Sequence, residues 1–125
     1  MEQKFFRCKH CGNFIGLINN AGVPMICCGE EMEELMPNTV EASTEKHIPD
    51  IMYDGDILNV TIGSVLHPST EEHYIEFIYV QTEKGGQRKS LTIGEPPVAN
   101  FSFVDDKPVE VFAYCNLHGL WSKKL

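Results

Sequence analysis

The chain has 125 residues, 42% of them hydrophobic and 22% charged, and a formal net charge of −8. This composition is typical of a folded globular protein, and the length allows one ordinary core plus a small module. The acidic balance argues against nucleic-acid binding, which uses clustered Lys and Arg. No segment approaches the ~20 apolar residues of a membrane span, and the N-terminus has no signal-like apolar run, so we expect no membrane partner and a cytoplasmic location.

The N-terminal segment, from Lys4 to about Leu35, is rich in Cys and Gly. In a reducing cytoplasm the odd number of five cysteines favours metal ligation over disulfides. So few apolar residues cannot hold a fold alone, and a metal would supply the missing stability. The Glu30 to Glu34 segment is interpreted as a solvated acidic stretch.

Four cysteines are spaced as Cys8-x2-Cys11-x15-Cys27-Cys28. Four thiolates suit tetrahedral iron or zinc. Zinc ribbons usually repeat the C-x2-C spacing on both sides, and the adjacent pair here departs from that pattern. A purely structural zinc clip stays open as an alternative. His10, between the first two cysteines, is interpreted as an exposed residue and not as a ligand.

After Met36 the pattern changes to the period-two alternation of β-strands. Regular spacing of these strands, without a long helical pattern, predicts an antiparallel sandwich or barrel. The sequence therefore predicts two domains, residues 1–36 and 37–125. The expected strands are Ile57–Val65, Tyr74–Thr82, Lys89–Ile93, Val98–Val104 and Val109–Tyr114, with possible edge strands at Val40–Ala42 and Pro49–Tyr53.

Four histidines and the fifth cysteine lie at segment ends in the strand-rich part: His47, His67, His73, Cys115 and His118. Cys115-x2-His118 follows a strand directly, and a single loop separates His67 from His73. Four imidazoles suit iron, copper or zinc, and one thiolate adds a soft donor. Five ligands leave one octahedral position open, which favours redox chemistry on a small molecule over a closed structural site.

These motifs resemble the desulfoferrodoxin type of superoxide reductase over essentially the whole chain. The four-cysteine segment resembles the desulforedoxin module, which holds a rubredoxin-like iron, and the remainder resembles an immunoglobulin-like catalytic domain. Three motifs frame the active iron in that family, and they stand here as Glu45-Lys46-His47, His67-Pro68 to His73, and Cys115-Asn116-Leu117-His118-Gly119.

The resemblance implies two iron ions per chain, with zinc possible in the four-cysteine site. The four histidines would be equatorial ligands of the second iron and Cys115 its axial ligand, with the sixth position open in the ferrous enzyme. Glu45 would occupy that position once the iron is ferric. The resemblance also implies a homodimer, formed largely through the N-terminal module.

The expected reaction is the one-electron reduction of superoxide to hydrogen peroxide, without dioxygen production. Lys46 would steer superoxide toward the site and help to deliver a proton. A small redox protein such as rubredoxin would donate the electron. Two alternatives remain: an electron-transfer protein with a cupredoxin-like copper or rubredoxin-like centre, and a non-enzymatic module with zinc at the four cysteines. A cupredoxin-like site would need only two histidines.

Overall fold

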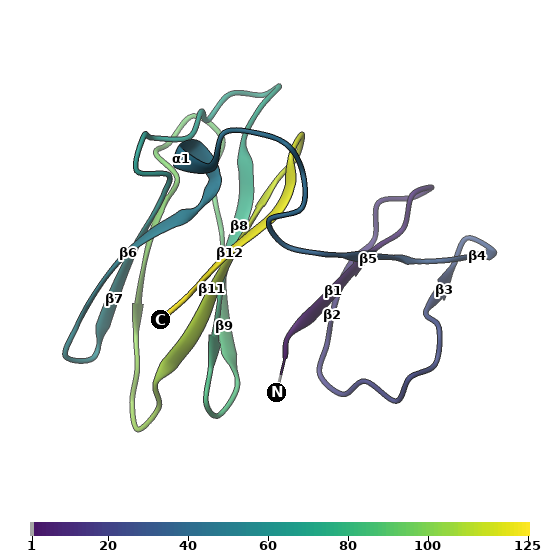
Figure 1. Cartoon of the computed structure of the whole chain (residues 1–125), viewed down its shortest axis with the longest axis horizontal. Helices are drawn as coiled ribbons and strands as arrows, with labels where there is room; N and C mark the ends of the chain where they lie inside the picture. Colours follow the sequence, from purple (N-terminus) through teal and green to yellow (C-terminus); the bar gives the residue numbers. More distant parts are fainter. Residues whose placement is uncertain (1) are drawn as a thin grey trace. The chain divides into compact units, whose positions relative to one another are not determined.

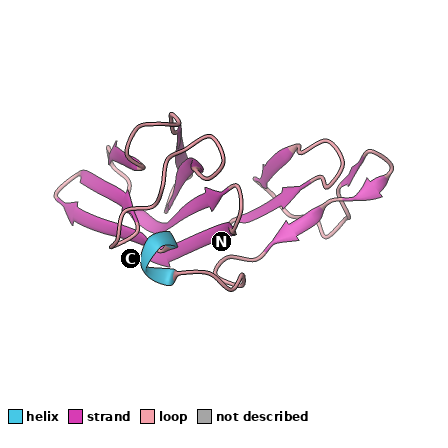
Figure 2. Ribbon diagram, turned by 90° about the horizontal axis from the view of Figure 1, so that it is seen from above, coloured by secondary structure: helices cyan, strands magenta, loops and turns pink. Residues whose placement is uncertain are grey.

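The structure, a computed structural model, describes residues 2–125. The chain forms two compact units, Met1–Met36 and Pro37–Leu125. Both are built from antiparallel strands, and Figure 2 shows α1 (Thr44–His47) as a single short helical turn. No helix in the described part of the chain is long and apolar enough to cross a membrane.

In the first unit, β1 (Lys4–Arg7) lies between β2 (Phe14–Leu17) and β5 (Glu33–Leu35), and β3 (Ile26–Cys27) pairs with β4 (Glu30–Glu31) (Figure 1). Among the described residues of this unit, the buried ones are Phe5, Cys8 and Met32. Such a small core cannot offset the chain entropy lost on folding. The stability of this unit would therefore depend on a metal ion held by its cysteines.

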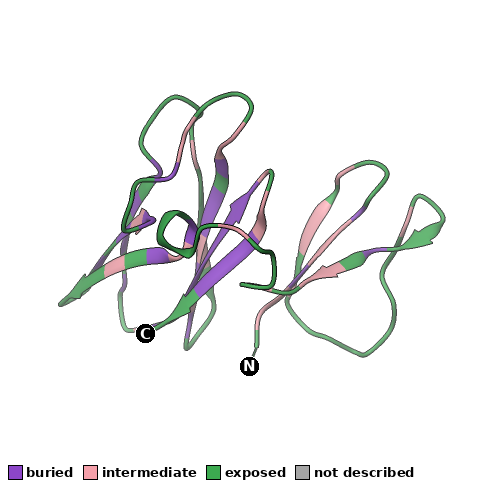
Figure 3. Cartoon of the chain, turned by 45° about the horizontal axis from the view of Figure 1, so that its top comes forward, coloured by how far each residue is buried: buried purple, intermediate pink, exposed green. Residues whose placement is uncertain are grey.

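The second unit is an immunoglobulin-like antiparallel β-sandwich. One sheet has the order β10-β7-β6 and the other the order β12-β11-β8-β9. Alternate side chains of β7, β8, β10 and β11 fill the space between them, and Figure 3 shows buried residues along the central strands and exposed turns. The strands are β6 (Pro49–Asp54), β7 (Ile57–Ile62), β8 (Ile75–Thr82), β9 (Gly86–Ser90), β10 (Val98–Ser102), β11 (Pro108–Cys115) and β12 (Gly119–Lys124).

The structure corrects several of the expected strands. β7 ends at Ile62 because Gly63 has φ +89°, a left-handed conformation that breaks the strand. β9 begins at Gly86, earlier than expected, where a side chain would collide with the Tyr79 ring. Val40–Ala42 forms no strand, and the possible edge strand at Pro49 is present as β6.

Two elements, β12 and α1, were not expected from the sequence. β12 was not expected, because it directly follows the turn after Cys115 and ends in exposed lysines. The four-residue α1 is too short to give a helical period. The Glu30 to Glu34 stretch has mostly exposed side chains, but its backbone pairs within β4 and β5. The interpretation as a solvated acidic stretch therefore holds for the exposed glutamate side chains, and the structure adds the backbone pairing.

Candidate metal centres

The four cysteines of the first unit lie together, with their sulfur atoms within 4.8 Å of one another. Cys11 Sγ lies 3.6 Å from Cys27 Sγ, and Cys27 Sγ lies 4.0 Å from Cys28 Sγ. Successive residues of an extended chain point to opposite sides, but Cys28 has φ +54°. This left-handed residue turns its thiol toward the same centre as its neighbour's thiol.

Backbone N–H groups point at the sulfurs of the first knuckle. The N–H of Cys11 donates to Cys8 Sγ at 3.5 Å, and the N–H of Asn13 donates to Cys11 Sγ at 3.4 Å. The Asn13 side-chain amide adds a bond to Cys27 Sγ at 3.6 Å. Hydrogen bonds of this kind stabilise thiolates and tune the potential of a bound iron.

The thiols of Cys8, Cys27 and Cys28 have pKa values shifted by their neighbours. The N–H of Cys11 is the main cause that lowers the pKa of Cys8 to about 6. Contacts with the neighbouring thiols, first that of Cys11, raise the pKa of Cys27 and raise that of Cys28 to about 12. A bound cation would remove this mutual opposition, because metal ligation deprotonates thiols. The donor set and the spacing of the sulfurs therefore fit a tetrahedral iron or zinc ion.

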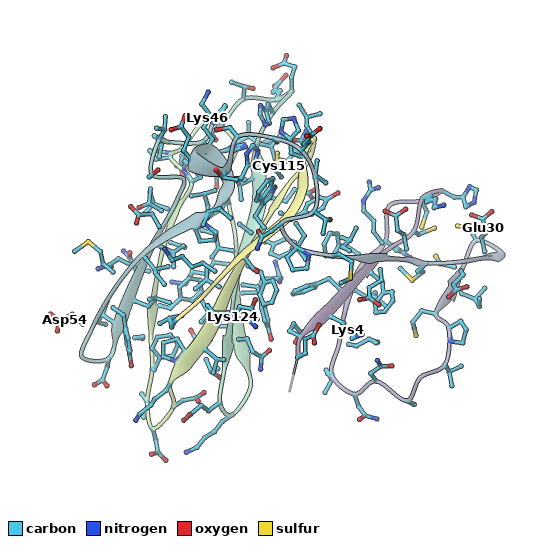
Figure 4. All side chains as sticks on the ribbon, viewed as in Figure 1. Lys4, Glu30, Lys46, Asp54, Cys115 and Lys124 are labelled. Carbon is cyan, nitrogen blue, oxygen red and sulfur yellow. The ribbon has the colours of Figure 1, made fainter. Side chains whose placement is uncertain are left out.

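The second cluster gathers side chains from three segments of the second unit. His47 ends α1, His67 and His73 lie between β7 and β8, and Cys115 and His118 lie at the β11–β12 turn. His47, His67 and Cys115 are buried, and the other two are half-buried. Figure 4 shows Cys115 and α1, with Lys46, at the same end of this sandwich.

The four imidazoles are arranged as a square. Neighbouring ring centroids are 4.5 to 5.1 Å apart in the order His47, His67, His73, His118, and the opposite pair His47 and His73 is 6.2 Å apart. Neighbouring rings are nearly perpendicular, with interplanar angles of 74° to 89°. Four nitrogen donors therefore surround one centre.

Hydrogen bonds determine which nitrogen faces that centre. His47 Nδ1 donates to Ser43 O at 2.6 Å, and His67 Nδ1 donates to Pro68 O at 2.7 Å. A carbonyl only accepts, so the proton sits on Nδ1 and each Nε2 carries a free lone pair. His118 presents its other nitrogen, with Nδ1 3.2 Å from His47 Nε2.

Two buried ring nitrogens of this cluster lack a hydrogen-bond partner within the described residues, and a bound cation would take that place. The buried Nε2 atoms of His67 and His73 have no hydrogen-bond partner in residues 2–125. Unpaired buried polar atoms of this kind are costly, and one ion at the centre would satisfy both. Burial is the main cause that lowers the pKa of His47 and His73, and it lowers that of His67 to about 4. These rings are therefore neutral at pH 7, as ligands must be.

Cys115 adds a soft donor to the square. Its Sγ lies 3.9 Å from His118 Nδ1 and within 4.8 Å of the ligand nitrogens of the other three histidines. Burial raises the pKa of this thiol, while the backbone N–H groups of Leu117 and His118 lower it. A buried thiol next to neutral imidazoles loses its proton when a metal binds. The set of four imidazoles and one thiol fits iron.

Glu45 and Lys46 lie exposed on the same helical turn as the buried His47. After burial, the charges of His118 and Lys46 lower the pKa of His73, so Lys46 acts on the cluster through space. The absence of a side chain at Gly63 lets the backbone of this turn pack against it. An added Cβ there would lie 2.7 Å from Lys46 O and 2.9 Å from Glu45 O.

Sequence reasoning missed Trp121, which supports two of the histidines. Its buried indole stacks on His47, and its Nε1 donates to His118 O at 3.1 Å. No sequence motif marks Trp121. The one available signal was its position, three residues after the candidate ligand His118. His10, which was left out of the ligands, is exposed and pairs with Glu30 at 3.1 Å.

Known proteins resemble the chain over both units. The family model described as Desulfoferrodoxin, N-terminal domain, matches residues 1–36, and that described as Desulfoferrodoxin matches residues 39–124. A desulfoferrodoxin from Syntrophotalea carbinolica is 39% identical over 119 residues, which cover 95% of this chain and 94% of the relative.

Solved structures show the same similarity. The superoxide reductase from Treponema pallidum has a TM-score of 0.84 and 38% identity, and the match covers 99% of this chain and 100% of that chain. A superoxide reductase from Giardia intestinalis, described as 1Fe-SOR, has a TM-score of 0.56 and 34% identity. That match covers 65% of this chain and 97% of the other.

Proposed function

This chain belongs to the desulfoferrodoxin family, and on that premise we propose how its own residues carry out the reaction of a superoxide reductase. The enzyme reduces superoxide with one electron and two protons to one hydrogen peroxide and releases no dioxygen. The observation that carries this function is the square of four imidazoles beside a buried thiol.

The protein binds two iron ions, and we assign the ligands of each from the clusters described above. When bound, the iron of the second cluster supplies the electron that superoxide takes up. The buried thiol raises the electron density available for that transfer. The first iron would be held by Cys8, Cys11, Cys27 and Cys28, with zinc possible in its place, and the second by His47, His67, His73, His118 and Cys115.

Lys46 is the residue that attracts the substrate. Superoxide is an anion and the chain carries a net charge of −8, so a local positive charge at the site is needed to attract it. The Lys46 ammonium is exposed, and its charge reaches His73 and His47. A lysine ammonium also holds exchangeable protons, so Lys46 would help to protonate the product.

Glu45 is the residue that releases the product. Its carboxylate precedes Lys46 on the same exposed turn. Oxygen donors are hard ligands and prefer ferric over ferrous iron. The Glu45 carboxylate would therefore ligate the oxidised ion and displace hydrogen peroxide.

The first unit would either relay electrons to the histidine site or have a structural role only. A small redox protein such as rubredoxin would donate the electrons. Cys11 and Cys28 are exposed ligands, which suits electron entry at this site. The Giardia protein described as 1Fe-SOR aligns with only 65% of this chain. That partial match supports a catalytic role for the second unit and an auxiliary one for the first.

We also propose a homodimer joined through the first unit. Ile18, Val23 and Ile26 of that unit are 91%, 70% and 62% exposed, an unusual amount of exposed apolar surface for 36 residues. Ile18→Glu should give monomers in sedimentation, whereas Val104→Glu, at a 92% exposed position of the second unit, should not.

A cytoplasmic location is also proposed, because five free cysteines suit a reducing compartment.

A pair of cysteine variants tests the division of roles between the two sites. Cys115→Ser should abolish superoxide reduction and leave the chromophore of the four-cysteine site intact. Cys11→Ser should remove that chromophore and leave superoxide reduction measurable. Full activity in Cys115→Ser, or complete loss of activity in a folded Cys11→Ser protein, would contradict the assignment.

A further inference from the structure

His73 lies on the loop between β7 and β8, outside any strand. The loop forms a turn in which Thr70 N–H donates to His73 O at 3.0 Å and His73 N–H donates to Thr70 O at 3.2 Å. These bonds fix the shape of the turn but not its place relative to the other ligands. A half-buried ligand on such a loop needs a support from outside it.

Asn116 supplies contacts on both sides of His73. Its side-chain Nδ2 donates to Glu72 O at 3.0 Å, and its Oδ1 accepts from Tyr74 N–H at 2.9 Å. Its backbone N–H also donates to Tyr74 O at 3.1 Å. One residue is thus bonded to both chain neighbours of His73, across 42 to 44 positions of sequence.

Asn116 also lies within the second ligand loop, directly after Cys115 and two residues before His118. We propose that Asn116 is a positioning residue that joins the two ligand loops and holds the His73 imidazole at its corner of the square. The bonds need one donor and one acceptor on the same short side chain, which an amide provides. A carboxylate would keep the bond to Tyr74 and lose the one to Glu72, and an aliphatic side chain would lose both.

Gln81 offers a matched control at the other end of β8. Its Nε2 donates to Thr82 O and Gly85 O at 3.0 and 2.8 Å, and its Oε1 accepts from the Tyr79 hydroxyl at 3.1 Å. Gln81→Leu therefore removes a comparable set of amide bonds without touching a ligand loop. The four-cysteine site serves as a second control within the same molecule.

The experiment measures iron release from the purified two-iron protein to an excess chelator, followed separately at the visible bands of the two centres. Asn116→Leu should speed release from the histidine site by about 10- to 100-fold, with a smaller increase in Asn116→Asp. Release from the four-cysteine site should stay unchanged in both variants. Gln81→Leu should lower the unfolding temperature without changing release from either site.

Unchanged iron release from the histidine site in Asn116→Leu would overturn the proposal, and so would an equal increase in Gln81→Leu. If Asn116→Leu does not fold, unchanged iron release in Asn116→Asp overturns it. The inference rests on the proposed ligand role of His73, which His73→Ala tests separately. Fast release in His73→Ala with normal release in the Asn116 variants would overturn the positioning role alone. Normal release in His73→Ala would overturn the ligand assignment itself.

Discussion

The indole of Trp121 stacks on the imidazole of His47, with the ring centroids 4.8 Å apart and the planes 24° apart. The same indole donates a hydrogen bond to the backbone oxygen of His118, so one buried side chain contacts the imidazole of His47 and the backbone of His118, whose ring is the neighbouring corner of the square. Strand β12, which carries Trp121, therefore belongs to the architecture of the site as well as to the sheet.

We predict that Trp121→Phe and Trp121→Leu differ in their effects. Phenylalanine keeps a ring against His47 and loses only the N–H donor, so it should lower the free energy of unfolding by about 1 kcal/mol plus a small packing loss. Leucine loses the stack as well and should cost ~3 kcal/mol or more and lower the iron content of the histidine site. Urea unfolding and metal analysis measure both effects. Equal iron contents in the two variants would show that the stack does not support His47.

Lys46→Ala should lower the bimolecular rate with superoxide by about tenfold and weaken its dependence on ionic strength. The rate would be measured by stopped flow or pulse radiolysis at several salt concentrations. Lys107→Ala, at an exposed position in the β10–β11 turn, changes the net charge equally and should have little effect. Lys46→Arg should restore the rate. If Lys46→Ala and Lys107→Ala behave alike, only net charge matters and Lys46 has no local role.

Glu45→Ala should alter the visible spectrum of the oxidised histidine site, because the carboxylate proposed to ligate the ferric ion is lost. The rate of the first reaction with superoxide should change little, since this carboxylate acts on the oxidised form. Glu71→Ala, at an exposed position near His73, is the control for a change in charge. An oxidised spectrum identical to that of the unmodified protein would refute ligation by Glu45.

The iron-free protein should lose stability as the pH falls from about 6.5 to about 4. Burial lowers the pKa of His67 from 6.5 to about 4, so in this window the unfolded chain binds a proton that the folded chain does not. Stability is therefore greatest above pH 6.5, and His67 alone removes on the order of 3 kcal/mol at most by pH 4. Urea unfolding at several pH values measures the loss. His67→Gln should flatten the profile, and an unchanged profile would assign the dependence to other groups.

The residues of both proposed metal sites were predictable in part because pairs of them form local motifs. Cys8-x2-Cys11, the adjacent Cys27 and Cys28, and Cys115-x2-His118 each place two donors within a few residues of one another, and the strand pattern located the loops between them. The alternation of apolar residues also predicted the central strands β7, β8, β10 and β11, although not all of their ends.

The supports of the site were not predictable, because they depend on contacts between distant segments. Trp121 meets His47 across 74 residues, Asn116 bonds to residues on either side of His73, and Gly63 packs against the backbone of α1. None of these contacts has a sequence period or spacing. The arrangement of the four imidazoles as a square likewise emerges only when α1, the β7–β8 loop and the β11–β12 turn meet at one end of the sandwich.

The products formed from superoxide test the central claim most directly. The reduced two-iron protein would be mixed with a known amount of superoxide under anaerobic conditions, and hydrogen peroxide and dioxygen would be measured together. We predict one hydrogen peroxide for each superoxide consumed, no dioxygen, and one oxidised histidine-site iron for each turnover without a donor. Dioxygen released with half an equivalent of peroxide would indicate dismutation and would contradict a reductase.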